Sequence, residues 1–208
     1  TIGGGIKTIK DVDHALNSGA DKVAINSAFI RNIEFLDQVV NVFGSQAVLG
    51  SIVARKHRYS WQIFTDNAKH RVKISPFDWA EEIIEHGVGE IMLTSIDNDG
   101  IEKGFDMDLI ENFDKIGKVP YLVSGGAGNT DHILNLIKKS NCSGVVIGSA
   151  LHYKKITVKE LNGRAIMMTT HVKDSIEDVG KGNHNRFVVD KSKTFARIEE
   201  KRLKIEAL

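Results

Sequence analysis

The sequence predicts an α/β fold of the (β/α)8-barrel type, with a pattern incomplete at the N-terminus and a polar C-terminal extension. Short apolar, β-branched runs alternate with helical patterns, which is typical of βαβ units and a parallel sheet. The chain has 208 residues, of which 41% are hydrophobic and 26% charged. This length and composition indicate one globular domain with a substantial core.

The expected elements follow one another along the chain. A capping box at Thr8 and Asp11 begins the first helix, which Gly19 ends. A long segment over residues 55–75 interrupts the alternation, and its apolar stretch 61–65 predicts a small hairpin over one barrel mouth. The remaining strands are expected at residues 22–26, 47–54, 90–95, 121–123 and 145–147, and the remaining helices at 33–43, 78–86, 107–116 and 130–139.

This count gives about five parallel strands, one of them partial at the start, whereas a complete barrel needs eight. Because the alternation fades after residue 162, we expect the missing units to precede Thr1. The expected organisation is a partial phosphate-binding barrel over residues 1–162 and an extension over 163–208. The extension is expected to be an appended helix or partly disordered, with helical potential over 194–207.

Charge and composition argue against several classes of protein. The formal net charge is +1, so no overall field attracts nucleic acid or an anionic membrane. No apolar run reaches the roughly 20 residues that a membrane helix needs. The single Cys142 cannot form an internal disulfide, which favours a cytoplasmic location. We expect no cofactor, and no metal, because His57, His70 and His86 lack the spacing of metal ligands.

An internal repeat is the most informative feature of the sequence. A Gly-Gly turn, a helix, a strand and a short segment with a serine occur in this order twice. Gly5 precedes Ser27 by 22 residues, and Gly126 precedes Ser149 by 23. We call Gly4, Gly5, Asn26 and Ser27 the first half-site, and Gly125, Gly126, Gly148 and Ser149 the second half-site.

Both half-sites have the chemistry of anion binding. Each places a glycine turn and a helix N-terminus at the carboxyl ends of strands, where barrel active sites lie. Free backbone N–H groups and the helix dipole favour an anion there, and each serine hydroxyl adds a donor. Two such sites predict an elongated ligand with a phosphate at each end. The alternative is that the glycines only close tight turns.

Short motifs extend this argument to a known family. They are GGGI at 3–6, ADKVAINS at 20–27, FGSQ at 43–46, EIMLTSIDNDG at 90–100, GFD at 104–106, SGGAG at 124–128 and SALHY at 149–153. Together they resemble the cyclase subunit of imidazole glycerol phosphate synthase over about three quarters of the chain.

The resemblance implies an enzyme of histidine biosynthesis that forms a heterodimer with a glutaminase. It would use ammonia released by the glutaminase to convert a bisphosphorylated aminoimidazole carboxamide ribonucleotide to imidazole glycerol phosphate. Lys22 and Glu90 match members of a charged ring at the barrel mouth opposite the active site, where ammonia enters. The alternative is that they form an ordinary surface salt bridge. Substrate and phosphate contacts would fall on Gly5, Asn26, Ser27, Thr94, Asp99, Gly100, Ser124, Gly126, Gly148 and Ser149.

The sequence departs from the family at the general acid and base. The family uses two aspartates, one of them on a first strand that this chain does not contain. The family pattern places the other at position 53, where this chain has Val53. Valine cannot transfer a proton, so we assign no catalytic residue and expect a poor or inactive cyclase.

Two other functions stay open. Related barrels conduct ammonia for amidotransferases that modify surface sugars, and Val53 fits that role better than it fits a cyclase. The retained half-sites fit the enzyme better. A gene fragment without function is the third possibility.

Overall fold

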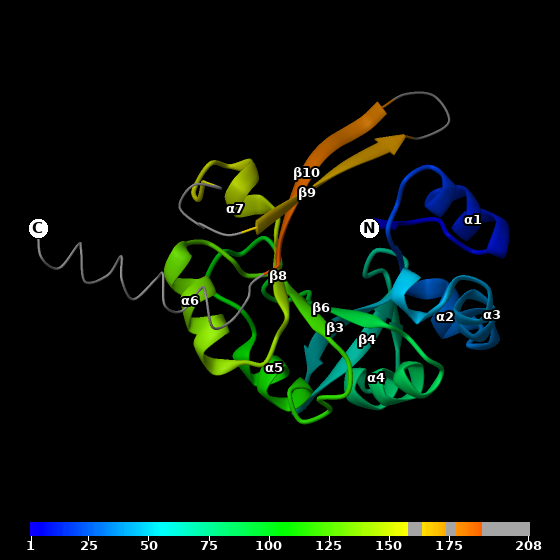
Figure 1. The fold of residues 1–208 in the computed structure, drawn as a ribbon. Coiled ribbons are helices and arrows are strands. Elements are labelled where there is room, and N and C mark those ends of the chain that lie inside the picture. The colour runs from blue at the N-terminus through cyan, green and yellow to red at the C-terminus, as the bar shows by residue number, and fades with distance from the viewer. Residues whose placement is uncertain (158–163, 174–177, 189–208) are drawn as a thin grey trace, which may run out of the picture.

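A curled parallel sheet organises the molecule. The computed structural model describes residues 1–157, 164–173 and 178–188, and the sheet forms an open arc with helices on its outer side (Figure 1). Neighbouring strands are parallel in the order β1 (Ile2–Gly3), β2 (Val23–Ile25), β3 (Val48–His57), β6 (Glu90–Ser95), β7 (Tyr121–Ser124) and β8 (Gly144–Ile147). This confirms the predicted α/β fold of barrel type, with β1 as the partial first strand.

Local sequence signals explain where the helices begin. The capping box is present, because Thr8 Oγ1 accepts from the Asp11 N–H while Asp11 Oδ2 accepts from the Thr8 N–H. Side chains at the N-caps of three later helices also accept backbone N–H groups. The helices are α1 (Ile9–Asn17), α2 (Ser27–Arg31), α3 (Glu34–Phe43), α4 (Pro76–Glu85), α5 (Met107–Phe113), α6 (Thr130–Lys139) and α7 (Ser149–His152), with a 3-10 turn at Ser45–Ala47.

The two faces of the sheet bury different side chains. On the outer face Ile52, Leu93 and Val123 pack under the helices in the main core. Alternate residues point to the inner face, where a small second cluster forms around Leu49 and Leu122. Towards the carboxyl ends of the strands this inner face becomes polar, which places the candidate site there.

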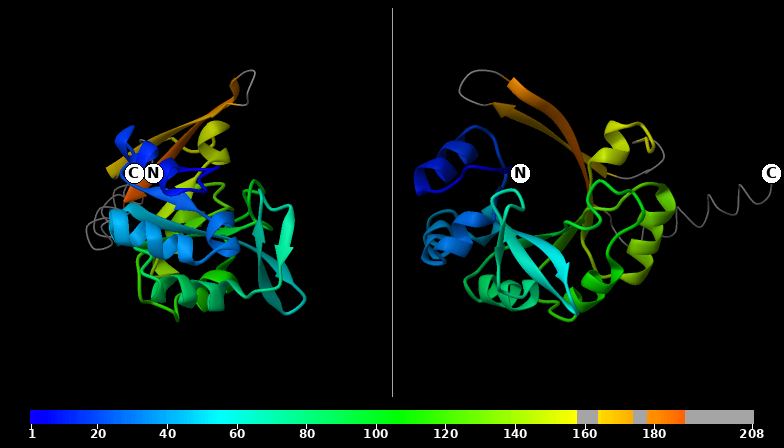
Figure 2. Two further views of the ribbon diagram at one scale, coloured as in Figure 1. Left: turned by 90° about the vertical axis from the view of Figure 1, so that its right-hand side faces the viewer. Right: turned by 180° about the vertical axis from the view of Figure 1, so that it is seen from behind.

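A hairpin stands beyond the carboxyl end of β3, as predicted. Strand β3 continues past the parallel sheet and pairs antiparallel with β4 (Ser60–Thr65), which pairs with β5 (His70–Val72). Figure 2 shows this hairpin projecting from one end of the sheet. It is therefore on the side where a barrel carries its active site.

The segment after α7 differs from the expectation. Residues in β9 (Arg164–Lys173) and β10 (Asp178–Val188) form an antiparallel hairpin, and β10 also pairs with β8. An appended helix or disordered extension was expected there. Neither strand has a regular alternation of apolar and polar residues, and the free edge of β8 offers a ladder of backbone partners. The helical potential expected over 194–207 lies outside the described residues.

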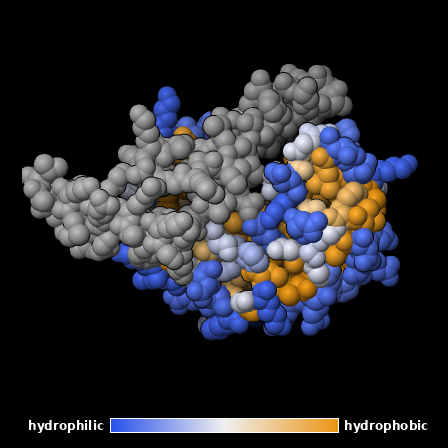
Figure 3. All heavy atoms as spheres, viewed as in Figure 1, coloured by the Kyte–Doolittle hydropathy of each residue, from blue (hydrophilic) through white to orange (hydrophobic). Residues whose placement is uncertain are grey.

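The surface is largely polar on the face seen in Figure 3, with apolar residues emerging mainly on the side of α1 to α3. Ile2 and Val42 are among the exposed large apolar residues, at 46% and 62% exposure. Within the described residues, no helix combines the length and apolar character needed to cross a bilayer.

Candidate functional site

A pocket of about 970 Å³ opens at the carboxyl ends of β1, β2, β3 and β6, beneath the tip of the β4–β5 hairpin. Five residues proposed from the sequence as substrate contacts line it, together with Val53. These five are Gly5, Asn26, Ser27, Thr94 and Asp99. The structure therefore brings the first half-site into one cavity with two polar residues of the β6 end and the loop after it.

The first half-site is open. Gly4 and Gly5 are exposed and have φ angles of +100° and +72°, which favour glycine. A Cβ atom built on either would meet no heavy atom within 4 Å. Asn26 caps α2 with φ −118° and ψ −82°, so the first N–H groups of that helix lie beside the glycine turn at the pocket.

The second half-site repeats this backbone but is covered. Gly125 and Gly126 have φ angles of +91° and +113°, and Gly148 caps α7 with φ −108° and ψ −85°. The close agreement of Gly148 with Asn26 supports the internal repeat at the level of backbone geometry. Both glycines of the turn are buried, and a Cβ on Gly126 would lie 2.1 Å from the carbonyl oxygen of Gly104.

Some proposed contacts do not line the large pocket. They are Gly100, Ser124, Gly126, Gly148 and Ser149. Ser124 nevertheless lies directly beside Thr94 in the sheet, and Thr94 lies beside Val53. A row of side-chain positions thus runs from β3 through β6 to β7, from the pocket towards the second half-site.

Val53 is half-buried at the pocket end of that row. An aspartate here would face the cavity, but an isopropyl group offers no proton to donate or accept. Within the row, the nearest polar groups are the hydroxyls of Thr94 and Ser124. They can hydrogen-bond a ligand, while their ordinary pKa values make them unsuitable as a general base near neutral pH.

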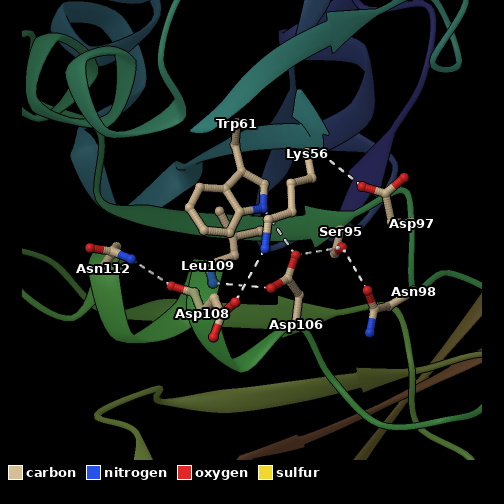
Figure 4. A network of polar contacts seen from close by, with 9 residues as sticks. All are labelled: Lys56, Trp61, Ser95, Asp97, Asn98, Asp106, Asp108, Leu109 and Asn112. Atoms are coloured by element: carbon tan, nitrogen blue, oxygen red, sulfur yellow. Dashed lines mark hydrogen bonds and ion pairs between the residues drawn. The ribbon is translucent and has the colours of Figure 1, made fainter. Parts of the chain in front are cut away.

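The loop after β6 is fixed by two aspartates (Figure 4). Asp97 Oδ2 accepts from the Lys56 N–H at 2.7 Å, so Asp97 ties the loop to the end of β3. Asp106 Oδ2 accepts from Trp61 Nε1 at 3.0 Å and from Ser95 Oγ at 3.3 Å. Its Oδ1 accepts from the Leu109 N–H and caps α5. The hairpin and this loop therefore meet at Asp106, a role that the sequence reasoning missed.

The hairpin tip, residues 66–69, was also missed as part of the site. It lines the pocket opposite the first half-site, as does His70. Asn26 Nδ2 donates to the carbonyl oxygen of Phe64 at 3.0 Å, so its amide nitrogen binds the hairpin. The buried Asn26 Oδ1 has no hydrogen-bond partner among the described residues. No spacing in the sequence indicates that Asn26 contacts the hairpin, so this contact could not be predicted.

Charge at the tip is balanced by an ion pair. Arg31 Nη2 lies 2.6 Å from Asp66 Oδ2 and 2.7 Å from Oδ1. The hydrogen bond from Arg31 lowers the pKa of Asp66 below its ordinary value of 3.8, so the carboxylate is ionised at neutral pH. Across the described residues, no group of three or more His, Cys, Asp or Glu is arranged to hold a metal ion.

At the opposite end of the sheet, Lys22 Nζ lies 2.8 Å from Glu90 Oε2. The Glu90 side chain is only 6% exposed, whereas that of Lys22 is 28% exposed. Lys22 immediately precedes β2 and Glu90 begins β6, so both stand at the amino ends of the strands. The two residues proposed for the ammonia entrance thus form an ion pair with each other.

Comparison with known proteins agrees with this architecture. A family model described as "Histidine biosynthesis protein" matches residues 1–157. The protein named "Imidazole glycerol phosphate synthase subunit HisF" from Natranaerobius thermophilus is 40% identical over 77% of this chain and 64% of its own length. Proteins of the same name from Flavobacterium johnsoniae and Bacillus cereus are 38% and 37% identical over the same shares. The chain spans 64% of the length of these curated relatives. It belongs to the histidine biosynthesis protein family.

Proposed function

We propose that this chain binds a ligand with a phosphate at each end, namely the bisphosphorylated aminoimidazole carboxamide ribonucleotide of imidazole glycerol phosphate synthase. The two half-sites with matching backbone geometry carry this proposal. Each combines a left-handed glycine turn with a helix N-terminus, which suits a phosphate. The hydroxyls of Thr94 and Ser124, adjacent on β6 and β7, suit the sugar or base between them.

The proposed chemistry is that of the cyclase, at a strongly reduced rate. Ring closure and cleavage require proton removal at one centre and donation at another, and each positioned group typically contributes about 10²–10⁴-fold. Val53 faces the cavity where one such group belongs. We therefore expect this chain to keep the ability to bind the ribonucleotide while converting it only slowly.

The ammonia would come from a glutaminase subunit in the cytoplasm, at the mouth where Lys22 and Glu90 pair. The relatives are named as subunits, which supports a partner. The ion pair stands at the amino ends of β2 and β6, the opposite end of the strands from the pocket, where a passage for a small neutral molecule would begin.

A second candidate function is favoured by Val53 alone. An ammonia-conducting partner of a sugar-modifying amidotransferase needs the entrance at Lys22 and Glu90 but no general acid or base. The row at the pocket, which lacks a carboxylate at position 53, fits that function. It predicts no gain of cyclase activity from any substitution at this position.

The test supplies the ribonucleotide with excess ammonium, which removes the need for a glutaminase, and follows substrate absorbance. Val53→Asp should raise the turnover rate about 10²-fold, because it places a proton-transferring group at the pocket. Val53→Asn is the matched control, since it adds polarity of the same size without a titrating group. Equal rates for both variants and the parent chain would contradict the proposed cyclase role of this position.

A further inference from the structure

The hairpin is held on the first half-site by contacts from one short segment, residues 26–31. Asn26 Nδ2 donates to the Phe64 carbonyl oxygen at 3.0 Å, and the Asp66 N–H donates to Ser27 Oγ at 3.0 Å. Arg31 then pairs with the Asp66 carboxylate at 2.6 Å. Three side chains of this segment, Asn26, Ser27 and Arg31, thus hold the hairpin at the half-site where a phosphate would bind.

The backbone of the tip is unusual. Asp66, Asn67 and Ala68 have φ angles of +53°, +56° and +63°, a left-handed run of three residues without glycine. Such residues typically cost about 1 kcal/mol or more each and persist where surrounding contacts over-determine them. Here the Lys69 N–H donates to the Thr65 carbonyl oxygen at 3.1 Å, which closes the turn. This turn places Lys69 in the lining of the pocket.

The cations around the pocket are not equivalent. Lys7, Arg31 and Lys69 all line it. Arg31 is neutralised by Asp66, whereas Lys7 and Lys69 make no ion pair with any described residue. Lys7 follows the glycine turn and Lys69 stands opposite on the hairpin. An anion at the first half-site would therefore share the pocket with two lysines that are not held in ion pairs.

We propose that Lys69 binds the phosphate held at the first half-site, and that Arg31 and Asp66 are positioning residues that hold Lys69 at the pocket. The proposal rests on the phosphate role proposed above for this half-site. Docking also orients Ser27: its oxygen accepts the Asp66 N–H, which leaves its own proton to donate to a phosphate oxygen. Asn26 contributes through the hairpin rather than through its amide nitrogen, because that donor is bound to Phe64.

This arrangement should affect ligand affinity much more than global stability. The Arg31 and Asp66 side chains are 56% and 32% exposed, and exposed ion pairs contribute little to folding. The pair acts by fixing the conformation of the hairpin tip, because its left-handed backbone could otherwise adopt other conformations. A phosphate contact from Lys69 is charge-assisted and is lost if the tip moves.

The experiment titrates the chain with inorganic phosphate and follows its amide NMR signals, while amide exchange reports on the hairpin tip. Lys69→Gln should weaken phosphate binding about five- to tenfold without changing exchange at Asp66. Arg31→Gln and Asp66→Asn should weaken binding similarly and also accelerate exchange at Asp66. The charge-swapped double variant R31D/D66R should recover both. Lys73→Gln, which removes a charge from the same hairpin outside the pocket, is the control and should change neither.

The outcomes separate this inference from the proposed function. If phosphate shifts Gly5 and Ser27 in the parent chain but Arg31→Gln and Lys69→Gln bind equally well, the inference is overturned and the half-site stands. If phosphate binding depends on Lys69 as expected but the bisphosphorylated ribonucleotide does not bind, the inference stands and the proposed function fails. If phosphate does not shift Gly5 or Ser27 at all, both are contradicted.

Discussion

The two half-sites share a backbone and differ in how closely the rest of the chain packs on them. The residues that cap their helices have nearly the same φ and ψ, −118° and −82° at Asn26 against −108° and −85° at Gly148. The glycine turn of the first is open, and only its Asn26 side chain bonds to a hairpin, at Phe64, 38 residues further along the chain. The second is covered by direct backbone packing, with Gly126 against the carbonyl of Gly104.

This difference separates two reasons for having glycine. At Gly5 the requirement is a φ angle of +72° in open space, so the residue serves the turn and the approach of a ligand. At Gly126 the requirement is also steric, because the loop that ends at Phe105 leaves no room for a side chain. The second half-site is therefore part of the packed structure, whereas the first can be altered with less effect on folding.

The largest expected effect comes from comparing alanine substitutions in the two turns. Gly126→Ala places a Cβ 2.1 Å from a backbone oxygen at φ +113°, so we expect about 3 kcal/mol or more of destabilisation. Gly5→Ala meets only the backbone penalty and should cost about 1 kcal/mol. Denaturant unfolding of both variants measures the difference, and equal costs would show that the packing distinction is wrong.

Asp106 supports both the hairpin at the first half-site and the loop packed on the second. Its substitution should therefore affect the two half-sites together. Asp106→Ala removes the acceptor of Trp61 Nε1 and the N-cap of α5, and we expect about 2–3 kcal/mol of destabilisation. Amide exchange should accelerate in the hairpin and in the 96–105 loop together. Asp106→Asn, which keeps one acceptor oxygen, serves as the milder control. Acceleration confined to the hairpin or to the loop would argue against a shared support.

A stabilising substitution sharpens the account of the hairpin tip. Ala68 has a φ angle of +63°, so Ala68→Gly should raise the free energy of unfolding by about 0.5–1 kcal/mol. Thermal unfolding checks the sign, with Ala47→Gly, in the 3-10 turn, as a control that should lower stability. A destabilised Ala68→Gly variant would mean that the left-handed backbone is not strained.

The smallest expected effect is a pH dependence confined to the first half-site. Arg31 lowers the pKa of Asp66 in the folded state, so the contribution of this ion pair to holding the hairpin tip is complete above pH 3.8, the ordinary pKa of an aspartate. It is lost as the pH falls through the lower folded value. Amide exchange at Asp66 should therefore accelerate only in that acidic range, before any change at Gly126. Simultaneous loss at both positions would indicate global unfolding instead.

Periodicity predicted the scaffold because that information is local. Strand 90–95 and helix 130–139 match β6 and α6 residue for residue, since β-branched runs and capping side chains define both ends. The repeat of Gly-Gly and serine likewise predicted two half-sites with related backbones. The hairpin over the mouth followed from one apolar stretch in a long loop.

Long-range docking could not be predicted in the same way. Nothing in the spacing of Arg31 and Asp66 indicates that they meet, and the amide of Asn26 was expected on a phosphate rather than on Phe64. The hairpin of β9 and β10 was missed because neither strand shows a regular alternation of apolar and polar residues. These contacts depend on how the sheet curls, which pairs residues far apart in sequence.

Titration with the bisphosphorylated ribonucleotide in excess ammonium, followed by NMR and absorbance, tests the central claim most directly. We predict that amides of both half-sites, including Ser27 and Ser149, shift with one midpoint while substrate absorbance stays nearly constant. Shifts at only one half-site would contradict a two-phosphate site. Rapid turnover by the parent chain would contradict the proposal that Val53 limits its chemistry.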